Sequence, residues 1–147
     1  MTDPSSCRFE LLDHPADMGF RAWAPTLEGL FAECATALTS ILVDIESIAP
    51  TNSQMIELPG DDIEMLLYNW LSEVLFLFDA DGLLFSKYSI NDIMTSESGL
   101  KLSARVHGEE FSASKHQVKT YVKAVTLHQL KVEKKENSYE AHVYVDI

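Results

Sequence analysis

The sequence predicts an α+β fold in which two α-helices pack on a largely antiparallel, multi-stranded β-sheet. Two segments repeat apolar residues at helical spacing, and most of the remaining chain alternates apolar with polar residues, as strands do. The strand-like segments come before, between and after the two helical segments, and the last of them form an uninterrupted run. This order is typical of helices placed against an antiparallel sheet.

The length and composition indicate a single domain over residues 1–147. The chain is 46% hydrophobic and 23% charged, as globular proteins are. A domain of this size can bury roughly 70% of the surface that its unfolded chain exposes. The sequence contains no internal repeat, low-complexity tract or linker that would divide it.

A hairpin is expected near the start of the chain. Residues 7–12 alternate apolar and polar side chains, and Phe20, Ala22 and Ala24 resume the alternation after a tight turn at residues 13–17. Two such runs joined by a short polar turn are typical of paired antiparallel strands.

The first helix is predicted over residues 27–43. Thr26 is the expected N-cap, because a threonine side chain before a helix can accept a hydrogen bond from a free N–H group of the first turn. One apolar stripe runs along the segment and consists of Leu27, Leu30, Phe31, Cys34, Leu38 and Ile41. The stripe predicts an amphipathic helix that lies on a surface.

The second helix is predicted within residues 61–85 and is expected to be the centre of the core. Asp61 followed by Glu64 is an acidic variant of the capping box that marks the start, and Gly82 suits the left-handed turn at the end. Apolar residues occupy almost the whole circumference of this helix. They are Ile63, Met65, Leu66, Leu67, Tyr68, Trp70, Leu71, Val74, Leu75, Phe76, Leu77 and Phe78. The rest of a domain covers such a helix.

The other strands are expected between and after the helices. They are residues 54–58, 84–93, 100–106, 121–133 and 139–147. Turns are expected at residues 95–99, 108–110 and 134–138, and residues 112–120 are polar and irregular.

The charge of the chain makes direct nucleic-acid binding an unexpected activity. With 23 acidic and 11 basic residues the formal net charge is −12, so a polyanion would be repelled. An acidic surface fits a basic partner protein or a hard cation, and it also serves solubility alone.

The sequence indicates a reduced, cytoplasmic protein. No apolar run is long enough to span a bilayer, and the first residues lack the basic flank and apolar core of a signal peptide. Cys7 and Cys34 stand far apart, which argues against a disulfide framework or a thiolate zinc site.

One tight turn holds Asp13, His14 and Asp17, with Gly19 just beyond it. Two carboxylates and an imidazole so close together can converge on a cation. Alternatively, Asp13 forms an Asx turn and His14 makes a hydrogen bond to the backbone. The residues alone leave both alternatives open.

The end of the chain is a second candidate. The α-carboxylate of Ile147 lies one residue from the Asp146 carboxylate, at the end of a predicted strand. Like charges at this separation repel unless a cation neutralises them or one takes a proton. Oxygen ligands select calcium or magnesium over zinc. The alternative is a frayed, solvated terminus.

Other polar residues give weaker signals. His116 and His128 lie near Lys119 and Lys123, but no HExxH or CxxC spacing supports a zinc hydrolase. Glu73 lies on the polar side of the second helix, where it could serve a buried network or a groove. No P-loop, GxGxxG or GxSxG motif supports nucleotide or triad chemistry.

Several short motifs resemble those of the archease family, small proteins associated with RtcB-type RNA ligases. They are residues 13–19, 70–78, 81–85, 108–109, 123–128 and 145–147, in the right order over nearly the whole chain. The first is similar to a DHTADIG turn of the family. Pro15 replaces its threonine, Met18 replaces its isoleucine, and Leu127 stands where an aromatic residue is frequent. All the carboxylates are present.

The resemblance implies an accessory protein rather than an enzyme. Its partner would be an RtcB-type ligase that joins RNA ends in tRNA splicing and RNA repair. The protein would promote guanylylation of the ligase's active-site histidine by GTP and so restore turnover. The family's metal site falls on Asp17, Asp146 and the terminal Ile147, in agreement with the cation expected at the chain end.

Two other functions compete with this one. A general folding chaperone would need an exposed apolar patch, yet regular elements account for almost all apolar residues in the predicted fold. A stand-alone metal-dependent hydrolase would use Asp17 and His14 and would act with no ligase present.

Overall fold

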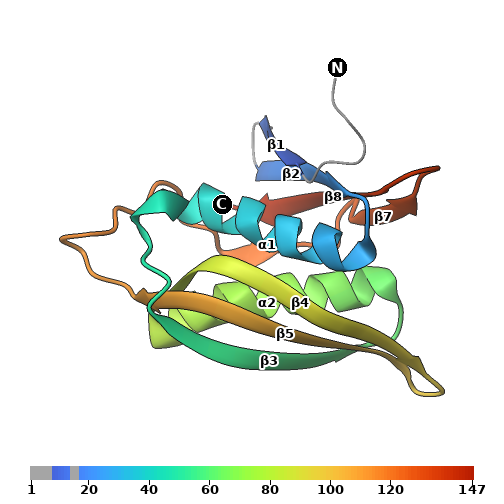
Figure 1. Ribbon diagram of the computed structural model, residues 1–147. Helices are drawn as coiled ribbons and strands as arrows, with labels where there is room; N and C mark the ends of the chain where they lie inside the picture. Colours follow the sequence, from blue (N-terminus) through green and yellow to red (C-terminus); the bar gives the residue numbers. More distant parts are fainter. Residues whose placement is uncertain (1–7, 14–16) are drawn as a thin grey trace.

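The protein is built in three layers, with both helices between two antiparallel sheets (Figure 1). The computed structural model describes residues 8–13 and 17–147, and it describes Asp13 and Asp17 by their backbone alone. Each helix contacts strands of both sheets. The predicted fold class is confirmed, with the difference that the strands divide into two sheets rather than one.

The first sheet has five strands and contains both ends of the described chain (Figure 1). The strands are β1 (Arg8–Asp13), β2 (Asp17–Ala24), β6 (Ala124–Val125), β7 (Lys131–Lys134) and β8 (Tyr139–Asp146). Their order is β1-β2-β8-β6, and β7 also pairs with β8. The predicted hairpin and the predicted last strand are both confirmed.

The second sheet has three strands in the order β3-β5-β4. They are β3 (Asn52–Gly60), β4 (Leu83–Ser96) and β5 (Gly99–Glu110). The turn predicted at residues 108–110 is wrong, because β5 continues to Glu110. At Gly108 the backbone of β4 comes so close that a Cβ atom would lie 1.8 Å from the Leu84 carbonyl oxygen. The glycine therefore permits a close strand contact, not a turn.

Helix α1 (Leu27–Leu42) begins as predicted, with the Thr26 Oγ1 accepting a hydrogen bond from the Gly29 N–H at 3.0 Å. A single 3₁₀ turn, η1 (Ile45–Ser47), follows it. The expectation that this helix lies on a surface is wrong, because Glu28 is its only exposed residue. Ala35 and Ala37 are fully buried, and such small side chains let other elements approach the helix closely.

Helix α2 (Ile63–Asp81) begins one residue later than predicted. Its N-cap is Asp62, which accepts a hydrogen bond from the Met65 N–H at 2.9 Å. Glu64 does not complete a capping box. Its Oε2 accepts a hydrogen bond from the Val132 N–H at 3.1 Å and so ties the helix to β7. The predicted end is confirmed, because Gly82 adopts a left-handed φ of 66°.

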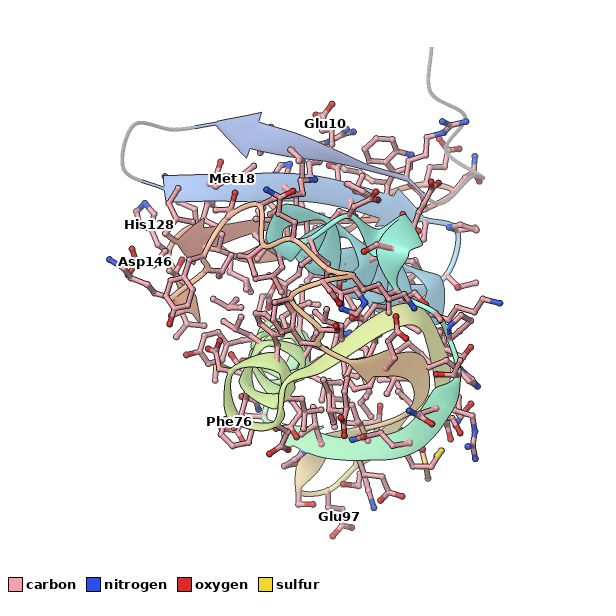
Figure 2. The ribbon with its side chains drawn as sticks, turned by 90° about the vertical axis from the view of Figure 1, so that its left-hand side faces the viewer. Glu10, Met18, Phe76, Glu97, His128 and Asp146 are labelled. Carbon is pink, nitrogen blue, oxygen red and sulfur yellow. The ribbon has the colours of Figure 1, made fainter. Side chains whose placement is uncertain are left out.

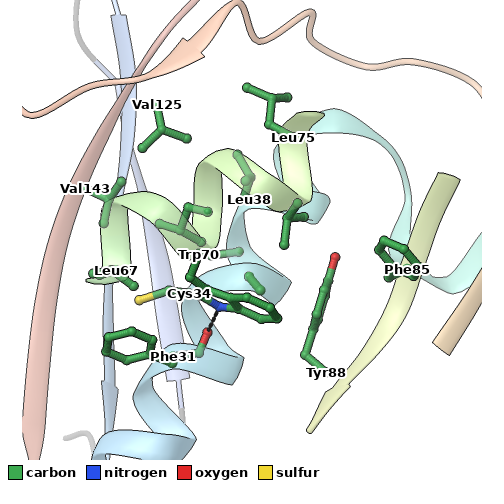
Figure 3. Packing of buried hydrophobic residues seen from close by; sticks show 14 of the residues in the cluster. Phe31, Cys34, Leu38, Leu67, Trp70, Leu75, Phe85, Tyr88, Val125 and Val143 are labelled. Carbon is green, nitrogen blue, oxygen red and sulfur yellow. Dashed lines mark hydrogen bonds between the residues drawn. The ribbon is translucent and has the colours of Figure 1, made fainter. Parts of the chain in front are cut away.

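Trp70 occupies the centre of the core between the two helices (Figure 3). Its indole is fully buried, and Nε1 donates a hydrogen bond to the Phe31 carbonyl at 2.9 Å. The ring meets Tyr88 edge-on at a centroid distance of 5.9 Å. The Tyr88 hydroxyl pairs with Thr39 Oγ1 at 2.5 Å, and burial raises the pKa of Tyr88. Every polar atom of this cluster thus has a partner.

The strand predicted over residues 121–133 is wrong. The chain instead forms β6 and β7 and turns between them, where Leu130 N–H donates to the Leu127 carbonyl and Gln129 has a φ of 56°. No glycine or proline marks this turn, so the alternation of apolar residues continues through it in the sequence. Neither described helix is long and apolar enough to cross a membrane.

Candidate functional site

The register between β2 and β8 brings two predicted site residues together at one end of these two inner strands of the five-stranded sheet. Asp17 is the Cα partner of Asp146, and Ile147 follows directly. Directly opposite residues of an antiparallel pair have Cα atoms about 4.5–5.5 Å apart. Figure 2 shows Asp146 on the same side of the molecule as Met18, His128 and Phe76. We call Asp17, Asp146 and Ile147 the C-terminal edge.

The side chain of Asp17 lies outside the described residues, as do the side chain of Asp13 and the whole of His14. Among the side chains that are described, no group of three or more His, Cys, Asp or Glu could hold a metal ion. One of the three predicted ligands is absent from that set. The metal site at Asp17, Asp146 and Ile147 therefore stays a prediction.

Residues 123–126 form backbone hydrogen bonds with the end of β8 on the side opposite β2. The Lys123 N–H donates to the Asp146 carbonyl at 2.7 Å, and Ala124 is the β6 partner of Asp146. Thr126 donates to the Tyr144 carbonyl twice, from its backbone N–H and from Oγ1, each at 3.0 Å. The last strand is thus paired on both sides where it reaches Asp146, and this pairing fixes the position of the Asp146 backbone.

Gly19 has a packing role at this edge. A Cβ atom there would lie 2.6 Å from Cδ1 of Tyr144 and 2.7 Å from the Val143 carbonyl oxygen. The tyrosine ring therefore lies across the backbone of β2, in space that any side chain at residue 19 would fill. His128 packs on the same tyrosine at a ring distance of 6.5 Å, which supports the structural interpretation of this histidine.

Glu109 belongs to one of the motifs that carry the family resemblance, but its contacts were not predicted from the sequence. Its carboxylate accepts hydrogen bonds from Ala49 N–H at 2.8 Å, His116 Nε2 at 2.8 Å and Lys115 Nζ at 2.9 Å. These bonds, the one from Lys115 most of all, lower the pKa of Glu109 to about 2. We call Glu109 and its three partners the Glu109 clasp. The contacts join Glu109 to Lys115 and His116 in the segment that follows β5 and to Ala49, which is distant in sequence.

The remaining candidates have structural roles or no described partner. His116 is buried, and its Nδ1 accepts the Ser112 N–H at 2.9 Å, so Nε2 carries the proton donated to Glu109. Lys119 covers the end of α1, donating to the Leu42 carbonyl from its N–H and to the Ser40 carbonyl from Nζ. Glu73 is half-buried and makes no hydrogen bond to another described group.

A groove opens between α2 and β6, next to the C-terminal edge. It has a volume of about 200 Å³ and is lined by Tyr68, Ser72, Leu75, Phe76, Asp79, Lys123, Ala124 and Val125. Phe76 is 56% exposed, and the nearby Tyr121 and Leu127 are 62% and 55% exposed. Phe76 lies in a regular element, α2, as predicted, yet its side chain is exposed, so membership of a helix or strand does not imply burial here.

Residues 9–147 match the model of the Archease protein family (MTH1598/TM1083). The chain belongs to the archease family. It is 36% identical over 140 residues to protein archease of Sulfurisphaera tokodaii, and 37% identical over 139 residues to that of Methanopyrus kandleri. Each match covers 95% of this chain and 99% of the relative.

Solved structures agree with the family assignment. The solution structure of Methanobacterium thermoautotrophicum protein 1598 is 33% identical and superposes with a TM-score of 0.84, covering 95% of this chain and 98% of that one. A crystal structure from Thermotoga maritima, described as an archease and possible chaperone, is 20% identical with a TM-score of 0.52. This second likeness concerns the fold alone. The resemblance read from the short motifs is thus confirmed.

Proposed function

We propose that this archease is a non-catalytic activator of an RtcB-type tRNA-splicing RNA ligase. It promotes guanylylation of the ligase's active-site histidine by GTP and thereby permits repeated turnover. The proposal is supported by family membership over residues 9–147 and by the register that pairs Asp17 with Asp146 beside the chain end. The register is the observation that carries most weight, because it sets Asp17 directly opposite Asp146, whose side chain is exposed.

The donor set at the C-terminal edge fits a hard cation. Positions directly opposite in an antiparallel ladder share one face of the sheet, and Asp17 and Asp146 are such a pair. Together with the Ile147 α-carboxylate they would supply oxygen ligands only, which suit calcium or magnesium. A bound divalent cation would neutralise these carboxylates and could meet the anionic phosphates of GTP held by the ligase. Asp17, Asp146 and Ile147 would hold the ion.

The charge of the chain favours a protein partner over direct RNA binding. A formal net charge of −12 repels RNA at long range, so the ligase is expected to hold the RNA and the GTP. If the protein acts on this ligase, we expect it to act in the cytoplasm.

A folding chaperone is the second candidate, and the exposed side chains of Phe76, Tyr121 and Leu127 favour it. A chaperone would suppress aggregation of many unrelated unfolded proteins. An activator would instead change the turnover of one ligase and leave unrelated clients unaffected. A stand-alone hydrolase would use Asp17 and His14 and would act with no ligase present, so assays of the isolated protein distinguish it from an activator.

A multiple-turnover ligation assay tests the proposal. Ligase is supplied with GTP, a divalent ion and excess RNA bearing 3′-phosphate and 5′-hydroxyl ends, with and without this protein. Without it, guanylylated ligase should complete about one round and stop, whereas with it product should keep accumulating. Asp146→Asn should lose this effect, and Asp92→Asn, an exposed aspartate on β4, is the matched control. Equal rates with and without the protein would refute the proposal.

A further inference from the structure

We propose that the groove between α2 and β6 binds a short segment of the RNA ligase in which an apolar side chain is flanked by one basic and one acidic residue. This inference rests on the proposed function, since it names the surface that recognises the same partner. It concerns residues outside the C-terminal edge, namely Phe76, Asp79 and Lys123.

The groove has an apolar floor with room for a side chain. Leu75 and Val125 are nearly fully buried beneath it, and Tyr68 is half-buried at its side. A volume of about 200 Å³ offers space for a large aliphatic or aromatic side chain. Pockets of this kind, apolar below and polar at the rim, hold the anchor residues of protein interfaces.

Large apolar side chains at the rim of the groove and in the segment that leads into its β6 wall remain exposed to water. Phe76 at the rim is 56% exposed, and Tyr121, two residues before Lys123, is 62% exposed. Val122 between them is fully buried, so the segment turns Tyr121 and Lys123 outward together. Exposed apolar residues collected around one hollow mark an interaction site, whereas scattered ones carry no such meaning.

The two walls of the groove carry opposite charges. Asp79 lies on the α2 wall and Lys123 on the β6 wall, and no ion pair involves either among the described residues. Partial burial raises the pKa of Asp79, as it does for a carboxylate that lacks a compensating cation. A basic residue beside Asp79 and an acidic one beside Lys123 would form an ion pair with each of them and fix the direction of the bound segment.

The groove adjoins the C-terminal edge through Lys123 and Ala124, which argues that one partner occupies both. Lys123 donates its N–H to the Asp146 carbonyl at 2.7 Å, and the neighbouring Ala124 pairs with Asp146. A ligase segment in the groove would therefore lie directly beside the predicted cation site. The groove would supply affinity, and the edge would act on the nucleotide site.

Binding of the full-length protein to the immobilised ligase tests this inference. Phe76→Ala and Asp79→Lys should each weaken binding about tenfold or more. Met94→Ala and Asp92→Lys are the matched controls, because Met94 is 57% exposed and both residues lie on β4, in the other sheet. These controls should bind as the wild type does. Thermal melts of all four variants show that each is folded.

The outcomes separate this inference from the proposed function. If the wild type binds and activates the ligase while all four variants bind equally well, the groove inference is wrong and the proposed function stands. If the wild type binds through the groove but does not raise turnover, the proposed function is wrong and the groove inference stands. A wild-type dimer in sedimentation that Phe76→Ala dissociates would assign the groove to a second copy and overturn the inference.

Discussion

The middle layer and the C-terminal edge of this protein are built in opposite ways. In the middle layer, Trp70, Phe31 and Leu67 are fully buried, and the polar atom of the indole has a partner. At the edge, Asp146 and Ile147 are exposed, and Asp146 forms no ion pair among the described residues. The backbone of the edge is nevertheless paired on both sides.

Because of this difference, we expect the middle layer to determine the stability of the fold and the C-terminal edge to determine binding. Burial of apolar surface stabilises the fold, and it is greatest where the helices lie between the sheets. Exposed carboxylates contribute little to folding but remain available to a cation or a partner. Substitutions in the two regions should therefore have different consequences, and the contrast can be measured.

The largest effect on stability is expected from Trp70→Ala. Removing a fully buried indole should lower the free energy of unfolding by roughly 3–5 kcal/mol. Urea denaturation measures the loss, with Phe76→Ala as the control on the same helix, because Phe76 is 56% exposed. A Trp70→Ala protein that unfolds like the wild type would place the indole outside the core.

A smaller loss is expected from Gly19→Ala, because Gly19 lies two residues from Asp17 and packs tightly against Tyr144. The new methyl group would lie 2.6 Å from Cδ1 of Tyr144, so the ring or the strand must shift. Overpacking of this kind costs about 1–3 kcal/mol. Gly82→Ala tests a different cause, because nothing lies within 4 Å of its added Cβ and its strain comes from a φ of 66°. Unchanged melting and an unchanged Tyr144 resonance in Gly19→Ala would contradict the packing described.

The Glu109 clasp should make residues 112–120 sensitive to acid. The pKa of Glu109 falls from 4.5 to about 2 on folding, so the stability that the ionised carboxylate contributes is complete above pH 4.5 and is lost as the pH falls toward 2. The protection of this segment against hydrogen exchange, corrected for the intrinsic exchange rate at each pH, should therefore fall over that interval. Glu109→Gln removes the titrating group and should flatten the dependence, with low protection already at neutral pH. Identical pH profiles for the two proteins would exclude the clasp as its cause.

The smallest effect on stability and the largest on activity are expected at the C-terminal edge. Asp17→Asn, Asp146→Asn and residues added after Ile147 should each weaken calcium or magnesium binding, because each removes a charged oxygen ligand. Melting in chelator should stay close to that of the wild type, since the core is untouched. Calorimetric titration beside the ligation assay measures both effects. An extended protein that binds the ion and activates normally would show that the terminal carboxylate is not a ligand.

The elements that could be predicted are those whose signal is local. Thr26 and Gly82 were identified as helix boundaries because capping depends on neighbouring residues. The choice of Asp61 over Asp62 failed because adjacent aspartates are equally good caps. The turn within residues 121–133 was missed because no glycine or proline marks it, and Gln129 carries the left-handed φ instead.

The site could be predicted only in part. The α-carboxylate and Asp146 are neighbours in sequence, so their proximity was visible at once. That Asp17 joins them follows from strand register, which the sequence alone does not define, and it was supplied by the family resemblance. The groove was missed for the same reason, because Phe76 and Lys123 meet only in the folded chain.

The strand order also has a consequence for how the protein folds. β3, α2, β4 and β5 follow one another in residues 52–110 and complete the three-stranded sheet through nearby segments. The β2–β8 pair instead joins residues near the start of the chain to its last ones, and closing so long a loop costs more entropy. The C-terminal edge is therefore expected to assemble after the three-stranded sheet, so that only a fully folded molecule presents it to a partner.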